Sequence, residues 1–234
     1  MKRFYKTTSV EPAPAEAGGF EVRLDNRPIR SPAKAPLVFK SWPLAQAVAA
    51  EWEAQAEDID PNAMPLMQLA STAVDLIGKG RQAIVDGVAA YAETDLLCYR
   101  AEHPQALVER QAQAWQPLLD WAALRYDAPL HVNAGLMPKP QPPDALRALR
   151  HAVEAYDDWT LSALQTATGS CGSLIVALAL VEGRIDAEEA FAVSQLDETF
   201  QIEAWGEDPE ATKRRAALRA DINACRRFVD LLRA

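Results

Sequence analysis

The sequence lacks the features on which several large classes of protein depend. Its three cysteines, Cys98, Cys171 and Cys225, are far apart in a chain of 234 residues. This spacing argues against a disulfide framework or a zinc knuckle and favours a reducing compartment. The longest apolar run, Leu174 to Val181, is far shorter than the ~20 residues that span a bilayer. The basic N-terminus leads into no apolar segment, so no secretory signal is predicted. We therefore expect a cytoplasmic protein that does not insert into membranes.

Motifs for catalysis and nucleotide binding are also missing. The chain contains no GxGxxG loop, no Walker phosphate loop and no GxSxG motif, which removes the commonest cofactor and nucleophile signatures. Cys171 lies in Gly-Ser-Cys-Gly, but a reactive thiol needs a basic partner; a closely packed start of a buried helix is the better interpretation. None of His103, His131 and His151 pairs with another His, Cys or carboxylate at the spacing of metal ligands, so each is expected to be a surface histidine. We expect no enzyme activity, metal, cofactor or small-molecule substrate.

Charge is unevenly distributed along the chain. The 24 Lys and Arg against 33 Asp and Glu give a net charge of −9, which disfavours nucleic-acid binding. Residues 186–210 hold nine acids and no Lys or Arg, whereas residues 211–234 hold seven Lys or Arg and two acids. Two helices with facing opposite charges explain this pattern, and so does an acidic surface that binds a basic partner. Asp197 and Glu198 are neighbours, so on a helix they point about 100° apart, which disfavours paired acid–base catalysis.

Periodicity predicts an α+β fold. Short strands are expected at residues 4–9, at 20–24 with a return through Ile29, and at 37–39. From Ser41 the pattern is helical, with a first helix up to the Asp60-Pro61-Asn62 break. Further helices are expected at 66–77, 82–93, from 103 with a kink or break at Pro117, and at 144–167, 171–182, 187–204 and 209–233. We predict a small β-containing domain with one helix over residues 1–62 and a larger multihelical domain over 63–234.

Two tryptophans have different expected roles. Trp52 continues the stripe of Leu44 and Val48, so it is predicted to be structural and to pack where the first helix meets the rest of the chain. Trp205 lies beside Gly206 at a helix end, within the acidic run. An aromatic ring among acids at the end of an element is typical of an interface anchor.

A series of short motifs runs through most of the chain. They are Arg3-Phe4-Tyr5-Lys6, Glu51-Trp52-x-x-Gln55, Met64-Pro65-Leu66-x-x-Leu69-Ala70-x-Thr72-Ala73-x-Asp75, Tyr91-x-x-Thr94-Asp95-Leu96-Leu97-Cys98-Tyr99-Arg100, Arg110-Gln111, Trp115-x-Pro117-Leu118 and Leu196-Asp197-Glu198-x-Phe200-Gln201-x-x-x-Trp205-Gly206. In order and spacing they resemble the chaperones that assemble the F1 sector of ATP synthase by holding its unassembled α-subunit. Met67 and Asp197 depart from the family pattern, which has Thr and Glu there.

The resemblance implies an orthogonal helical bundle after the β-containing domain, and neither enzymatic activity nor a nucleotide cofactor. It implies the F1 α-subunit as partner, held until the β-subunit replaces it, and the mitochondrial matrix as the compartment of eukaryotic relatives. It places Asp197, Glu198, Gln201 and Trp205 at the client-binding surface. Two alternatives remain: a helical adaptor with a different basic client, and a helical enzyme with an unrecognised site. Asp197 and Glu198 are expected in the middle of their helix, with local ionic partners from the Arg-rich final helix.

Overall fold

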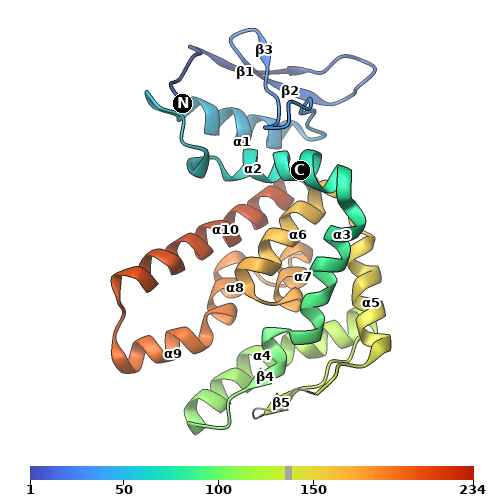
Figure 1. The fold of residues 1–234 in the computed structure, drawn as a ribbon, viewed down its shortest axis with the longest axis vertical. Helices are drawn as coiled ribbons and strands as arrows, with labels where there is room; N and C mark the ends of the chain where they lie inside the picture. Colours follow the sequence, from blue (N-terminus) through green and yellow to red (C-terminus); the bar gives the residue numbers. More distant parts are fainter. Residues whose placement is uncertain (135–138) are drawn as a thin grey trace. The chain divides into compact units, whose positions relative to one another are not determined.

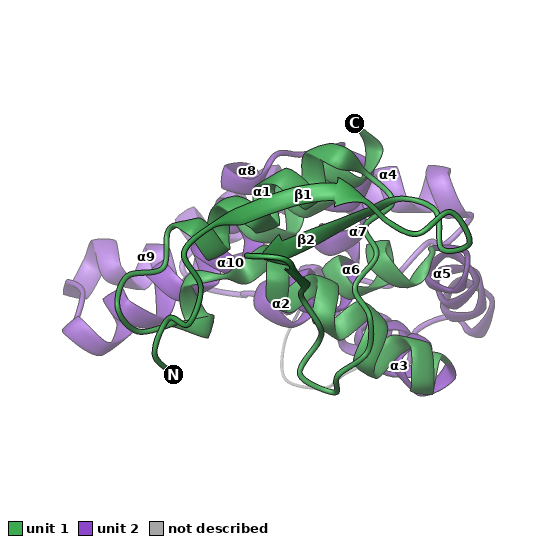
Figure 2. Ribbon diagram, turned by 90° about the horizontal axis from the view of Figure 1, so that it is seen from above, with its two compact units in different colours: residues 1–81, 157–163, 224–234 green, residues 82–156, 164–223 purple. Residues whose placement is uncertain are grey.

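The computed structural model describes residues 1–134 and 139–234 and confirms the α+β class, with short strands near the N-terminus followed by helices (Figure 1). The chain forms two compact units, and neither is continuous in sequence (Figure 2). Unit 1 comprises residues 1–81, 157–163 and 224–234, and unit 2 comprises 82–156 and 164–223. The division into folding domains at residue 62 stays a prediction.

The sheet of unit 1 is a small antiparallel meander. Its strands are β1 (Thr8–Pro12), β2 (Phe20–Leu24) and β3 (Arg27–Pro28), in the order β1-β2-β3. Thr8 pairs with Leu24 and Pro12 with Phe20. The strand expected at 4–9 therefore begins later, and the strand expected at 37–39 is reduced to a bridge between Phe39 and Phe20.

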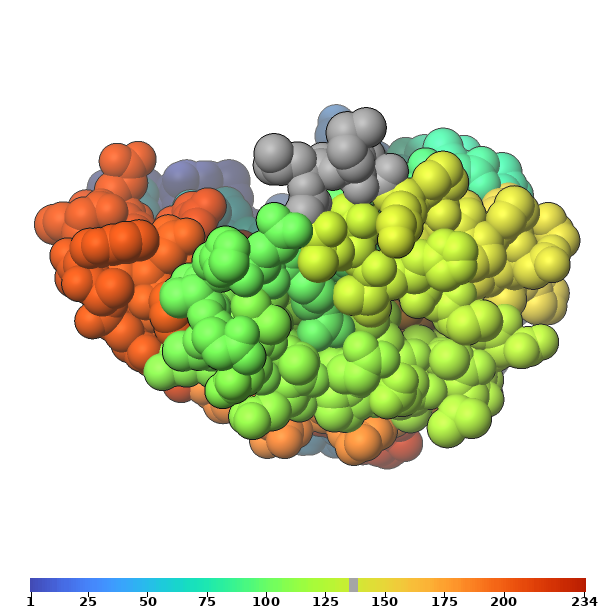
Figure 3. All heavy atoms as spheres, turned by 90° about the horizontal axis from the view of Figure 1, so that it is seen from below, coloured from blue at the N-terminus to red at the C-terminus, as the bar shows by residue number. Residues whose placement is uncertain are grey.

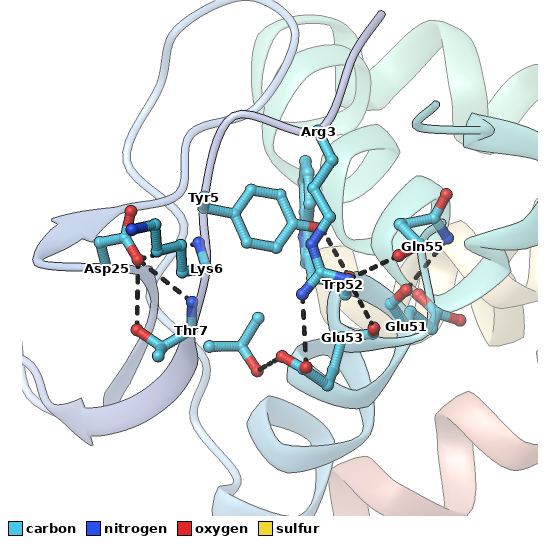
Figure 4. A network of polar contacts seen from close by, with 10 residues as sticks. Arg3, Tyr5, Lys6, Thr7, Asp25, Glu51, Trp52, Glu53 and Gln55 are labelled. Carbon is cyan, nitrogen blue, oxygen red and sulfur yellow. Dashed lines mark hydrogen bonds and ion pairs between the residues drawn. The ribbon is translucent and has the colours of Figure 1, made fainter. Parts of the chain in front are cut away.

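The turn after β2 depends on one carboxylate. Asp25 has a left-handed backbone with φ of 53°, a conformation that a short polar side chain tolerates. Its Oδ1 accepts hydrogen bonds from the backbone N–H groups of Lys6 at 3.0 Å and Thr7 at 3.1 Å. These bonds lower the pKa of Asp25, and they fix the register at which the N-terminal segment meets the sheet (Figure 4).

Helix α1 (Trp42–Glu53) packs on β1 and β2 and begins as the sequence predicts. The Ser41 hydroxyl accepts from the backbone N–H of Leu44 at 3.4 Å and donates to the backbone carbonyl of Leu231 at 2.5 Å. Leu44 and Val48 are fully buried. Ser41 thus caps α1 and also ties it to the C-terminal segment of unit 1.

The end of α1 organises the next helices. Glu51 accepts hydrogen bonds from the backbone N–H groups of Leu66 at 2.8 Å and Met67 at 2.9 Å, and so caps α2 (Pro65–Thr72). Burial nevertheless raises the pKa of Glu51. The Oε1 of Gln55 accepts from the backbone N–H of Asp60 at 2.7 Å. After α2 follow a π-helical turn and then α3, with bounds Ala73–Ile77 and Gly78–Ala89.

Trp52 is half-buried in unit 1. Its ring contacts Tyr5 edge-on, with centroids 5.8 Å apart, and the Tyr5 hydroxyl donates to the Trp52 carbonyl at 2.5 Å (Figure 4). The indole lines a cavity of about 480 Å³ together with Met64 and Met67. Its Nε1 is covered and has no hydrogen-bond acceptor among the described residues. The structural role of Trp52 stays a prediction, and these contacts are the interactions that a substitution would remove.

The core of unit 2 surrounds a buried carboxylate at the start of α7 (Leu174–Glu182). The apolar run from Leu174 to Val181 is completely buried. Asp95 accepts hydrogen bonds from the Ser173 hydroxyl at 2.7 Å and from the backbone N–H groups of Leu97 and Ile175, each at 3.1 Å. Burial raises the pKa of Asp95, although these donors lower it. A single carboxylate therefore satisfies donors at the start of α7 and on the segment before it.

The other elements of unit 2 are mostly helical. In chain order they are two 3₁₀ turns (Ala90–Thr94 and Leu96–Cys98), β4 (Tyr99–Arg100), α4 (Gln105–Tyr126), β5 (Asn133–Ala134), α5 (Pro143–Glu154), α6 (Asp158–Cys171), α8 (Ala187–Ser194), α9 (Leu196–Trp205) and α10 (Pro209–Arg233). Strands β4 and β5 pair in parallel. Both α6 and α10 contribute residues to each unit. None of the helices in the described part of the chain is long and apolar enough to cross a membrane.

Helix boundaries differ from those predicted at Pro117 and at Asp157. Helix α4 is continuous through Pro117, because Pro117 and Gln113, whose carbonyl loses its partner, are both exposed to water. The helix expected at 144–167 is split into α5 and α6. The Asp157 carboxylate accepts from the backbone N–H groups of Trp159 and Thr160, both at 2.9 Å, and so starts a new helix.

We expect Asp95→Asn to lower the free energy of unfolding by about 1–3 kcal/mol, because an amide N–H would face donors in a buried site. Urea denaturation measures this change. The exposed Asp86→Asn serves as the control and should cost less. Equal stabilities of Asp95→Asn and the wild type would show that the carboxylate does not hold α7.

We expect Trp52→Arg to destabilise unit 1 by about 2–4 kcal/mol, because it removes the ring contact with Tyr5 and brings a charge beside Met64 and Met67. Trp52→Phe keeps an aromatic ring and should lose less. Thermal melts of both variants provide the measurement. A Trp52→Arg protein that melts at the wild-type temperature would contradict a structural role.

Candidate functional site

The four residues singled out in the acidic segment all lie on α9. The helix expected at 187–204 is interrupted at Gln195, whose φ and ψ of −107° and 20° separate α8 from α9. Asp197 and Glu198 are consequently in the first turn of α9 and not in the middle of a helix. This corrects the expected position. Negative charge is favourable there, because the first turn carries unpaired N–H groups and the positive end of the helix dipole.

Asp197 is held by a neutral residue of α4 and not, as expected, by an arginine of the final helix. Its Oδ1 accepts a hydrogen bond from Nε2 of Gln111 at 2.7 Å. The Gln111 side chain is buried, and its Oε1 accepts from the backbone N–H of Ala101 at 2.8 Å. Both ends of the Gln111 amide are therefore used, and the amide holds the Asp197 carboxylate in one orientation.

Glu198 is paired with the final helix, as the sequence predicts. Its Oε2 lies 2.6 Å from Nη2 of Arg214. The Glu198 side chain is 22% exposed and that of Arg214 is 66% exposed. From the next residue of α10, Nη2 of Arg215 donates to the Thr199 hydroxyl at 3.0 Å. The first turn of α9 is thus tied to α10 by two adjacent arginines.

The second half of α9 is turned to solvent. Gln201 is exposed, and its side chain has no hydrogen-bond partner within residues 1–134 and 139–234. Trp205 is 81% exposed at the end of the helix. Glu203 forms an ion pair with Arg110 of α4 at 2.7 Å, and the same guanidinium lies over the Phe200 ring at 5.2 Å. Figure 3 shows α4 in green and the segment around α9 in orange reaching the same face.

Helical spacing explains how the four residues are arranged. Asp197, Gln201 and Trp205 follow at intervals of four residues and therefore form one stripe. Glu198 is one position further along and faces Arg214. A partner that contacts the stripe meets an acid, an amide and an exposed indole in succession.

The residues that support this stripe are not evident from the sequence. Gln111 and Arg110 of α4 hold Asp197 and Glu203, but no role was predicted for either. They lie far from α9 in sequence, so only the fold brings them together. Their place among the family-like motifs was the one available signal.

The described residues contain no reactive thiol among Cys98 and Cys171 and no metal-binding cluster. Cys98 and Cys171 are buried, and burial raises the pKa of each thiol to about 12, so neither is a nucleophile at neutral pH. Gly172 has a left-handed φ of 64°, and Ser173 caps α7; the Gly-Ser-Cys-Gly segment lies at the end of α6 and leads into a buried helix. Within residues 1–134 and 139–234 no group of three His, Cys, Asp or Glu is arranged to hold a metal ion.

We expect Asp197→Lys to lower the free energy of unfolding more than Glu198→Lys does. Asp197→Lys leaves a buried Gln111 donor without an acceptor, which costs about 1–3 kcal/mol. Glu198→Lys breaks a partly exposed ion pair and should cost about 0–1 kcal/mol. Urea titrations of both variants, and of Glu198→Lys combined with Arg214→Glu, measure the difference. The reverse order of stabilities would show that Glu198 is the structural acid of the pair.

The chain is similar to known proteins over nearly its whole length. The sequence profile of the family described as ATP12 chaperone protein matches residues 2–123. A mitochondrial protein of Schizosaccharomyces pombe, atp12, is 25% identical over 246 residues, covering 96% of this chain and 83% of that protein.

Solved structures extend the similarity to the fold. Atp12 from Paracoccus denitrificans is 43% identical, with a TM-score of 0.92, over 99% of this chain and 98% of that one. A variant of the same protein that replaces an aspartate by lysine is 42% identical, with a TM-score of 0.92, over 99% of this chain and 97% of that one. The Atu1473 protein of Agrobacterium tumefaciens is 42% identical, with a TM-score of 0.93, over 99% of this chain and 86% of that one. The chain therefore belongs to the ATP12 family of F1-ATPase assembly chaperones.

Proposed function

We propose that the protein binds the unassembled α-subunit of F1 and prevents its aggregation until the β-subunit takes its place. The observation that carries this proposal is α9, a helix with a fixed pair of acids at one end and an exposed Trp205 at the other. An exposed aromatic ring beside oriented charges is the composition of an interface anchor. Family membership supports an F1 subunit as the client.

The stripe on α9 offers a partner three kinds of contact. The Trp205 indole provides apolar area that becomes buried on binding. Asp197 uses Oδ1 for Gln111 and Glu198 uses Oε2 for Arg214, while the second oxygen of each carboxylate has no hydrogen bond within the described residues. These oxygens are available to Lys, Arg or backbone donors of a client. Charged groups of this kind steer encounter and set the register of the complex.

The proposed mode of action requires no catalysis. A lone α-subunit exposes an apolar face that its neighbours in the assembled ring would cover, and such a face aggregates. The chaperone covers this face, and a tighter-binding β-subunit displaces it by mass action. The sequence contains no phosphate-binding loop, so release is not driven by ATP hydrolysis. We place the protein in the cytoplasm, and its eukaryotic relatives in the matrix; the three free cysteines are consistent with a reducing compartment.

An adaptor with a different basic client is the second candidate. The same acids and the same indole would serve it, so α9 alone does not separate the two candidates. The identity of the client does. An adaptor would bind another basic protein and would leave the aggregation of the α-subunit unchanged.

We expect the wild type to suppress light scattering by refolding α-subunit at stoichiometric concentration and without ATP. Glu198→Lys should fold normally and lose about 2–5 kcal/mol of binding free energy, because like charges then face a basic client surface. Trp205→Ala tests the anchor in the same assay, and Glu16→Lys, an equal charge change in the β1–β2 loop, is the matched control.

Thermal melts on the same preparations separate loss of binding from loss of fold. Wild-type binding by both Glu198→Lys and Trp205→Ala would remove α9 from the interface. A strict requirement for ATP, or scattering that the wild type does not reduce, would contradict the proposed function itself.

A further inference from the structure

A cavity with charged side chains in its lining lies next to the connection between α9 and α10, within unit 2. It has a volume of about 450 Å³ and is lined by Phe191 of α8, Glu207 of the α9–α10 connection, and Arg215, Arg219 and Asn223 of α10. The three residues from α10 are four apart and therefore form one helical face. The small side chains of Ala216 and Ala220 complete the lining. The cavity thus presents two guanidinium groups of the basic final helix next to Glu207, which belongs to the acidic run.

Phe191 holds both guanidinium groups in place. The Arg215 and Arg219 groups lie 5.2 and 5.6 Å from its ring centroid, distances at which cation–π attraction operates. Arg219 is also paired with a carboxylate: its Nε donates to one oxygen of Glu188 at 3.0 Å, and its Nη2 donates to the other oxygen. Two parallel hydrogen bonds of this kind are the usual bidentate contact between an arginine and a carboxylate.

Within the described residues, Arg215 makes no such two-point contact with a carboxylate. Its Nη2 donates to the Thr199 hydroxyl at 3.0 Å, and its Nε is 3.6 Å from an oxygen of Glu207. Its Nη1 is covered and has no acceptor among the described residues. The side chain is only 15% exposed. A guanidinium has five donors and strongly favours a planar, two-point acceptor. Arg215 is therefore an oriented, largely desolvated cation with an incomplete set of acceptors.

We propose that Arg215 binds a carboxylate of the client, and that Glu207 occupies this place weakly until the client arrives. The proposal rests on the proposed function, because it identifies a second contact of the same complex. Glu207 is two residues beyond Trp205, so the segment that carries the exposed indole also carries the internal acid. A client carboxylate on the Nε and Nη2 side of Arg215 displaces Glu207 toward solvent.

The consequence is a binding surface of two signs. The Asp197 and Glu198 carboxylates select basic groups of the client, and Arg215 selects an acidic group in the region beyond Trp205. Charges of alternating sign fix the register of a complex more strictly than a single acidic patch, because a shifted partner brings like charges together.

The test uses variants whose expected effects have opposite signs. Glu207→Gln removes the internal competitor, so we expect the α-subunit to bind several-fold more tightly to it than to the wild type. Arg215→Lys keeps the charge but loses the two-point geometry, so we expect binding about tenfold weaker. Arg226→Lys is the matched control, because Arg226 is on the same helix and is paired with Asp230 through Nε at 3.0 Å and Nη2 at 2.6 Å; its binding should be unchanged. Melts of each variant report stability.

Weaker or unchanged binding by Glu207→Gln at wild-type stability would overturn the proposal, since Glu207 and Arg215 would then be only a structural tether. Citrate titrated into the chaperone without client, and followed by calorimetry, tests a free anion as the source of the carboxylate. Micromolar citrate binding that Arg215→Lys abolishes would overturn the assignment to the client. If the wild type does not bind the α-subunit at all, the proposed function is wrong, and the assignment of Arg215 to the client is wrong with it.

Discussion

Helix α9 has no buried residue of its own, and this constraint determines how the surface around it is built. A helix normally gains most of its stability from an apolar face packed on a core. Here polar contacts to α4 and α10 replace much of that packing: Gln111 with Asp197, Arg214 with Glu198, Arg215 with Thr199 and Arg110 with Glu203. The acids of α9 therefore have two tasks. They hold the helix, and they form its outward surface.

This double use follows from the chemistry of a carboxylate. Each carboxylate has two oxygens. On Asp197 and Glu198 one oxygen accepts a hydrogen bond, and the other accepts none from the residues that the structure describes. Trp205 does not contribute to holding the helix, since it is 81% exposed. A helix held by exposed ion pairs opens more readily than one held by a core. Such a helix adapts to a client more easily than the buried α7 would.

Local features of the sequence predicted much of the fold. The cap at Ser41, the strand at 20–24 and the partner of Glu198 in the final helix are confirmed, because each depends on neighbouring residues or on a strong charge pattern. The breaks at Asp157 and Gln195 and the continuity through Pro117 were not predicted. The continuity depends on which side of α4 faces solvent. The break at Asp157 depends on a side chain that accepts hydrogen bonds from backbone N–H groups.

The candidate site was predictable only in part. Asp197, Glu198, Gln201 and Trp205 stand out in the sequence. Gln111 does not, because its role depends on a contact with Asp197, which is distant in sequence. Arg215 does not either, because only the fold shows that its Nη1 is covered and has no acceptor among the described residues.

Amide hydrogen exchange of the chaperone with and without the F1 α-subunit tests the central claim most directly. The account predicts new protection across residues 196–205 and in the following connection, with little change in β1. Strong protection in β1 or α1 with α9 unchanged would contradict it.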